Sequence, residues 1–212
     1  MKSNFKYVCV IAIFVLSIIV KLLAKSAGAP AHSTGAPGEL TCSNSTCHAG
    51  KTAVLNIGSG VTSISFEDSL NKFVAGKKYI VNVSISQDSL TKYGFQATAL
   101  NDFEEGYGEI SLKDSKKTLI HPPEKTEFLD RMYVDQSTNG NTFTSRKANW
   151  QFYWIAPDEI KGPVTFYVAY VAGNGDKANT GDYVYTNKLT VKPVNLKVEE
   201  KYSYDTKKME LK

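Results

Sequence analysis

Two cysteines and a histidine lie close together in the segment TCSNSTCH, where four residues separate Cys42 from Cys47 and His48 directly follows. Covalent attachment of a c-type haem uses this set of groups: two thiols that bond to the haem vinyl groups, and an adjacent imidazole as the proximal iron ligand. The usual gap between the cysteines is two residues, and a longer gap is a variant of multihaem cytochromes. The segment therefore predicts haem c bound by Cys42 and Cys47, with His48 on the iron.

Two other interpretations of the same residues stay open. A disulfide between Cys42 and Cys47 would close a small loop and stabilise the fold by about 2–3 kcal/mol, but it would have no use for His48. A zinc ion would also accept two thiolates and an imidazole, but the sequence offers no clear fourth ligand.

A sixth iron ligand is the weaker part of the haem prediction. The chain has three histidines. Apart from His48, they are His32, in a Gly/Pro-rich stretch ten residues before the first cysteine, and His121, which precedes two prolines. Either is a candidate distal ligand, whereas Met132 and Met209 are thioethers without further support. A five-coordinate iron is the remaining option.

The N-terminus predicts export. Lys2 and Lys6 precede an apolar run of about 14 residues, which is short for a membrane-spanning helix, and small residues follow. We expect residues 1–27 to be a signal peptide cleaved near Ala27, with an uncleaved anchor as the alternative. Cys9 leaves with this peptide, so the mature protein would keep two cysteines in an oxidising compartment: the periplasm, the cell surface or the medium.

The charge of the chain gives no support for nucleic-acid binding. Four of its 25 basic residues and none of its 21 acidic residues lie before residue 28, so the mature chain is formally neutral. The expected partner is a redox protein or a surface ligand, with membrane contact only if the N-terminal segment stays attached.

The elements that would position the cysteine segment are β-strands. Residues 28–52 form a Gly/Pro-rich loop with the cysteines at its end, and residues 53–193 show strand patterns throughout. The predicted strands are 53–57, 61–66, 81–85, 94–100, 108–113, 131–135, 149–157, 164–173 and 183–193. This pattern predicts an all-β, immunoglobulin-like β-sandwich, followed by a charged tail at 194–212. Trp150, Phe152 and Trp154 alternate along one strand and are expected to fill the core.

Four blocks of the chain, TGAPGELTCSNSTCHAG, GFQATALN, WQFYWIAP and GPVTFYVAYVAGNGD, occur in an order and spacing that resemble exported bacterial proteins with a Reelin-like (Reeler) domain, also called choice-of-anchor V proteins. The resemblance spans roughly residues 30–192. It implies a β-sandwich outside the cytoplasm and a leading C-x-x-C-H segment, which maps onto Cys42, Cys47 and His48. The chain departs from the family in its longer gap and in having Asp135 and Gln136 where relatives often have histidine and threonine.

The remaining candidates predict ordinary structure. GNGD (173–176) is expected to be turn chemistry, with a calcium site as the alternative, and Asp102, Glu104 and Glu105 are expected to form a solvated loop. The sequons at 44–46 and 82–84 have no role in a bacterial export route. With no catalytic or nucleotide motif, we expect a non-enzymatic haem protein for electron transfer or sensing. The alternative is an extracellular binding or adhesion module with a Cys42–Cys47 disulfide.

Overall fold

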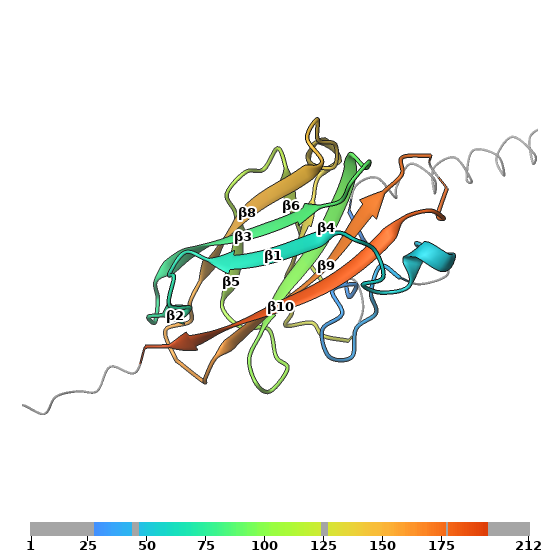
Figure 1. Ribbon diagram of the computed structural model, residues 1–212. Coiled ribbons are helices and arrows are strands. Elements are labelled where there is room, and N and C mark those ends of the chain that lie inside the picture. Colours follow the sequence, from blue (N-terminus) through green and yellow to red (C-terminus); the bar gives the residue numbers. More distant parts are fainter. Residues whose placement is uncertain (1–27, 44–46, 124–126, 177, 195–212) are drawn as a thin grey trace, which may run out of the picture.

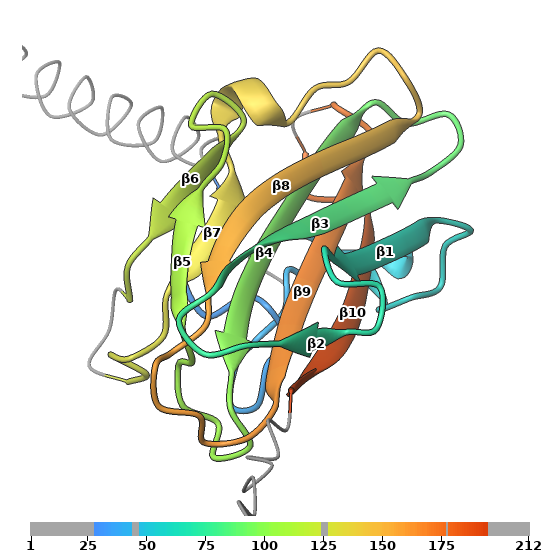
Figure 2. The ribbon, with the colours of Figure 1, turned by 90° about the vertical axis from the view of Figure 1, so that its left-hand side faces the viewer.

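Ten β-strands account for nearly all the regular structure in the residues that this computed structural model describes, which are 28–43, 47–123, 127–176 and 178–194. The strands form two facing sheets (Figures 1 and 2). The four-stranded sheet has the order β1 (Val61–Phe66), β3 (Lys78–Ser86), β8 (Lys147–Ile155), β5 (Glu109–Leu112). The six-stranded sheet has the order β2 (Lys72–Phe73), β10 (Tyr183–Pro193), β9 (Val164–Gly173), β4 (Lys92–Leu100), β7 (Tyr133–Gln136), β6 (Thr118–His121). Two short 3-10 helices are η2 (Lys51–Ala53) and η3 (Thr138–Gly140).

The long strands of each sheet are hydrogen-bonded to their neighbours over nearly their whole length. β3 and β8 are antiparallel from Lys78 opposite Ile155 to Ser86 opposite Lys147. β9 lies at the centre of the other sheet, antiparallel to both β4 and β10, whereas the two-residue β2 is parallel to the end of β10. Because successive side chains of a strand point to opposite faces, each of these strands turns one row inward and one row outward.

The core lies between the two sheets and is rich in aromatic rings. Trp150, Phe152 and Trp154 of β8 are buried there, as predicted, and the ring of Trp154 meets Phe166 of β9 edge to face at 5.5 Å. Both indole N–H groups are satisfied by backbone carbonyls, which is the condition under which a tryptophan can be fully buried. The predicted β-sandwich is confirmed.

The predicted strands are confirmed with one exception. Residues 164–173 and 183–193 match β9 and β10 at both ends, and the other strand predictions overlap β1, β3, β4, β5, β7 and β8. The prediction of a strand at 53–57 is wrong: η2 and a turn occupy that segment, and Asn56 bonds back to the backbone of Thr186. β2 and β6 were not predicted: β2 has only two residues, and β6 is a four-residue strand at the edge of its sheet.

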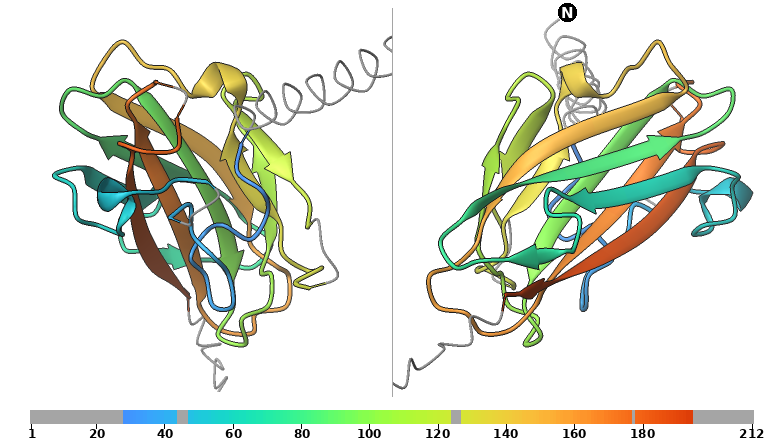
Figure 3. Two further views of the ribbon diagram at one scale, coloured as in Figure 1. Left: turned by 90° about the vertical axis from the view of Figure 1, so that its right-hand side faces the viewer. Right: turned by 60° about the vertical axis from the view of Figure 1, so that its left-hand side comes forward.

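Residues 28–43 cross the outer face of the six-stranded sheet, which Figure 3 shows with this segment in blue. Gln96 of β4 fastens the segment, because its side-chain oxygen accepts the N–H of Ser33 and its side-chain nitrogen donates to the carbonyl of Pro30. The expected N-terminal loop is therefore a folded layer over this sheet, and it positions the cysteine segment.

The ends of the chain fall outside the described residues. These are the predicted signal peptide (1–27) and all but the first residue of the predicted charged tail (194–212). Within the part of the chain that is described, no helix is long and apolar enough to span a bilayer.

Candidate functional site

The cysteine segment is closed into one loop at the edge of the N-terminal layer. The backbone N–H of His48 donates to the carbonyl of Cys42 at 3.2 Å, which brings the first cysteine next to the Cys47–His48 pair. A second backbone bond, from Ala49 to the carbonyl of Asn179, ties this loop to the connection between β9 and β10. The structure thus gathers the two thiols and the imidazole that the sequence singled out.

His48 is oriented by a buried carboxylate that is 134 residues away in the sequence. Its Nδ1 lies 2.7 Å from Oδ2 of Asp182, whose side chain is 7% exposed and whose Oδ1 accepts the backbone N–H of Asn174 at 2.9 Å. Histidines that bind metals are held in this way, with one ring nitrogen on a carboxylate and the other directed to the metal. With Nδ1 engaged, Nε2 is the nitrogen of His48 that can coordinate a metal, and its side chain is 28% exposed.

Cys42 differs from its partner in its surroundings. Its side chain is buried against Ala169 of β9 and Val184 of β10, whereas Cys47 is half-buried. Burial raises the pKa of the Cys42 thiol to about 12, with smaller contributions from the charges of Asp135 and Cys47. Both cysteines are separate thiols in this structure. Cys47 and His48 are accessible as the haem interpretation requires, but Cys42 can bond to a vinyl group only before the loop packs onto the sheet.

His32 folds back toward the cysteine loop but directs its ring elsewhere. The sulfur of Cys42 lies 4.0 Å from the carbonyl oxygen of Ser33, so the two segments are in contact. The imidazole of His32 points to β7 instead, where its Nδ1 lies 3.0 Å from the hydroxyl of Tyr133. Its Nε2 is buried without a hydrogen-bond partner among the described residues.

His121 lies at the far side of the same sheet. Its Nδ1 is 3.0 Å from the carbonyl oxygen of Ala29 and 3.3 Å from Oδ2 of Asp135. The strand register aligns Asp135 of β7 with Thr186 of β10, three strands away, which is about 14 Å across the sheet. Thr186 is in turn four residues from Asp182, or about 13 Å along the strand. In this arrangement His121 does not reach an iron bound at His48, and the ring of His32 is directed to Tyr133 instead.

The other candidate ligands are placed apart from this loop. Met132 is partly exposed before β7, and Met209 lies outside the described residues, as does the sequon at 44–46. Among the residues with described positions, no three His, Cys, Asp or Glu side chains are grouped so that they could hold a metal ion. In the GNGD turn, Asp176 accepts the backbone N–H of Ala178, a bond typical of turns.

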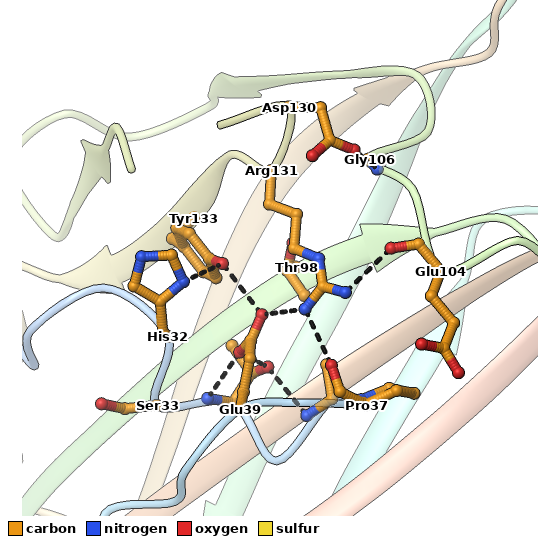
Figure 4. A network of polar contacts seen from close by, with 12 residues as sticks. His32, Ser33, Pro37, Glu39, Thr98, Glu104, Gly106, Asp130, Arg131 and Tyr133 are labelled. Atoms are coloured by element: carbon orange, nitrogen blue, oxygen red, sulfur yellow. Dashed lines mark hydrogen bonds and ion pairs between the residues drawn. The ribbon is translucent and has the colours of Figure 1, made fainter. Parts of the chain in front are cut away.

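A buried ionic network, which no sequence pattern predicted, holds the middle of the N-terminal layer (Figure 4). Arg131 and Glu39 form an ion pair at 2.8 Å with side chains 1% and 0% exposed. The same carboxylate accepts the hydroxyls of Tyr133 and Thr34, while Arg131 also donates to the carbonyls of Pro37 and Glu104. Glu39 and Thr34 lie in TGAPGEL, the start of the first block that resembles the Reeler family. This resemblance was the one sequence signal that could have pointed to the network.

Asp135 and Gln136, where the chain departs from the family it resembles, both bond to residues of β4. The side-chain oxygen of Gln136 accepts the backbone N–H of Phe95 at 2.7 Å, at the end of the β4–β7 pairing. In the predicted acidic loop, Glu105 accepts the side-chain amide of Asn101, and both groups are components of a loop between β4 and β5.

Comparisons with known proteins give likenesses of fold. The Reelin-N domain of F-spondin is 21% identical over 60% of this chain and 83% of its own length, with a TM-score of 0.42. The human F-spondin reeler domain is 23% identical over 61% and 88% of the two chains, with a TM-score of 0.42. A cohesin module from a Clostridium perfringens family 33 glycoside hydrolase is 13% identical over 63% and 96%, with a TM-score of 0.45. No family model and no curated protein matches the chain. The β-sandwich is established by the strand pairing of the chain itself.

Proposed function

We propose that this protein is an exported, non-catalytic β-sandwich module that carries a covalent c-type haem on Cys42 and Cys47, with His48 as the proximal iron ligand. The observation that supports this best is the bond between His48 Nδ1 and the buried Asp182 carboxylate at 2.7 Å. A surface histidine beside a disulfide has no need of such a bond, whereas a proximal ligand is oriented by one.

The position of Cys42 sets an order of events. Its thiol is packed against the sheet, so haem attachment would precede the docking of residues 28–43. The haem would then supply redox or ligand-binding chemistry at the edge of the sandwich. Because His32 and His121 are committed to the β7 side of the sheet, His48 would be the one imidazole on the iron, and this arrangement favours sensing of a small ligand over electron transfer.

The alternative function is a binding or adhesion module with a Cys42–Cys47 disulfide. The apolar packing of Cys42 favours it, since a buried sulfur against Ala169 and Val184 is typical of a structural cysteine.

The visible spectrum of the protein matured in a host with a cytochrome c maturation system separates the two functions. We expect a Soret band that shifts or is lost in His48→Gln and is unchanged in His121→Gln. His121 is a matched control, because its exposed fraction (27% against 28%) and its pairing with a buried aspartate resemble those of His48. A Soret band that responds equally to both substitutions would contradict the assignment of His48, and a colourless protein would contradict the haem.

A further inference from the structure

Asp135 is a carboxylate buried beneath the first residues of the N-terminal layer, and one of its oxygens accepts no hydrogen bond from the described residues. It lies on β7 with 0% exposure, and its Oδ1 accepts the side-chain amide of Gln96 at 2.9 Å. Its Oδ2 accepts no hydrogen bond from the described residues but forms an ion pair with Nδ1 of His121 at 3.3 Å, a nitrogen that also lies 3.0 Å from the carbonyl oxygen of Ala29. A buried carboxylate oxygen that accepts no hydrogen bond is stabilised by any further donor or cation that reaches it.

Gly28 packs against the side chain of Asp135. A β-carbon placed on Gly28 would lie 3.2 Å from Cβ and 3.4 Å from Cγ of Asp135, and 3.7 Å from the carbonyl oxygen of Gln136. The main-chain nitrogen is about 2.5 Å from that position, so it lies within about 6 Å of the Asp135 carboxyl carbon. Gly28 has a φ of +107°, a backbone conformation that disfavours any side chain there.

The predicted signal peptide, residues 1–27, ends immediately before Gly28. Cleavage after Ala27 is hydrolysis of the Ala27–Gly28 peptide bond: water supplies the oxygen of a new carboxylate on Ala27, and the nitrogen of Gly28 becomes a protonated α-amine. The usual pKa of an α-amino group is about 8, so the group is mostly protonated and charged at neutral pH. In the precursor the same nitrogen is a neutral amide.

We propose that the α-ammonium group of Gly28, released by signal cleavage, binds Asp135 Oδ2 and locks the N-terminal layer onto the six-stranded sheet. The site is an amine-binding site built from a buried carboxylate and the Gln136 carbonyl, and its ligand is the new end of the chain itself. Glycine fits because a β-carbon would press against the Asp135 side chain. The ammonium group would also offset the cost of burying the Asp135 carboxylate. Desolvation raises the pKa of Asp135, and His121, Gln96 and the backbone amide of Ala29 lower it less strongly.

This site makes docking of the layer depend on processing. The charge that pairs with Asp135 exists only after residues 1–27 are removed, so the precursor would hold its N-terminal layer less tightly. The inference is independent of the haem, because none of its contacts involves Cys47 or His48.

Two mature chains that differ by one residue test the proposal. One begins at Gly28 and the other at Ala27, which moves the ammonium about 3.5 Å further along the chain. We expect the melting temperature of the Gly28 chain to be higher by roughly 5–10 °C. The difference should vanish in Asp135→Asn and persist in Asp182→Asn, which changes another buried aspartate, just before β10. Equal melting temperatures, or a difference that survives Asp135→Asn, would overturn the proposal.

A second measurement needs no substitution. The rate at which an acylating reagent modifies the α-amine at pH 7 should be at least about tenfold lower in the Gly28 chain than in the Ala27 chain, since pairing holds the proton on the amine. Equal rates would overturn the proposal, as would N-terminal sequencing of the exported protein that begins at any residue other than Gly28.

Discussion

Arg131→Met is expected to lower the free energy of unfolding by about 3–5 kcal/mol, because it leaves a buried carboxylate without its partner. The Arg131–Glu39 pair is 2.8 Å long with side chains 1% and 0% exposed, so solvent does little to screen it. Methionine keeps most of the arginine stem but none of its donors, so the carbonyls of Pro37 and Glu104 also lose a bond. The loss is a large fraction of the 5–15 kcal/mol that is typical of a domain.

Urea unfolding and hydrogen exchange measure this effect together. We expect the unfolding midpoint to fall and the amides of residues 28–43 to exchange faster, because the pair joins this segment to the sheet. Glu39→Gln should also be destabilising, and the double variant should lose less than the sum of the two, with a coupling of about 1–3 kcal/mol.

Arg146→Met is the matched control, because Arg146 and Asp88 form a pair at 3.9 Å with side chains 67% and 87% exposed. An exposed pair contributes about 0–1 kcal/mol. The reasoning would be refuted if the Arg131 and Arg146 variants lost equal stability, or if the effects of Arg131→Met and Glu39→Gln were additive.

Four further outcomes follow from the packing of Cys42, Gly106 and Trp154. The pKa of Cys42 rises from 9.0 to about 12 in the fold, so at pH 8 iodoacetamide should alkylate native Cys42 about a thousandfold more slowly than the unfolded chain; equal rates would contradict its burial. Since the folded-state pKa is the higher one, the same thiol stabilises the fold below about pH 9, and urea midpoints should show that contribution falling toward pH 12. Gly106→Ala places a β-carbon against the carbonyl oxygen of Asp130 and should cost about 1–3 kcal/mol in the unfolding free energy, a result that a neutral substitution would disprove. Trp154→Phe removes the donor to the carbonyl of Tyr107 and should lower the unfolding free energy by about 1–3 kcal/mol. Unchanged stability in calorimetry would contradict this role of the indole N–H.

The fold could be predicted from the sequence where strands are long and one face is apolar. β9 and β10 show this pattern over ten and eleven residues, and their bounds matched the prediction at both ends. β2 and β6 are short edge strands whose pairing depends on neighbours that are distant in the sequence, so no local pattern marks them.

The candidate site was predictable only in its local part. The spacing of Cys42, Cys47 and His48 identified the segment, but the carboxylate that orients His48 is 134 residues away and reaches it through the β9–β10 connection. Arg131 and Glu39 are likewise 92 residues apart. Single charged residues have no period or spacing from which a partner can be inferred, so such pairs emerge only from the folded chain.

The haem itself is tested most directly by a pyridine haemochrome spectrum and an intact mass, both taken on denatured protein after expression with a cytochrome c maturation system. Our proposal predicts a c-type haemochrome that stays with the unfolded polypeptide, and its loss when Cys42 and Cys47 are both replaced by alanine. A colourless polypeptide whose mass is lower than that of the reduced chain by two hydrogens would contradict it and would establish the Cys42–Cys47 disulfide instead.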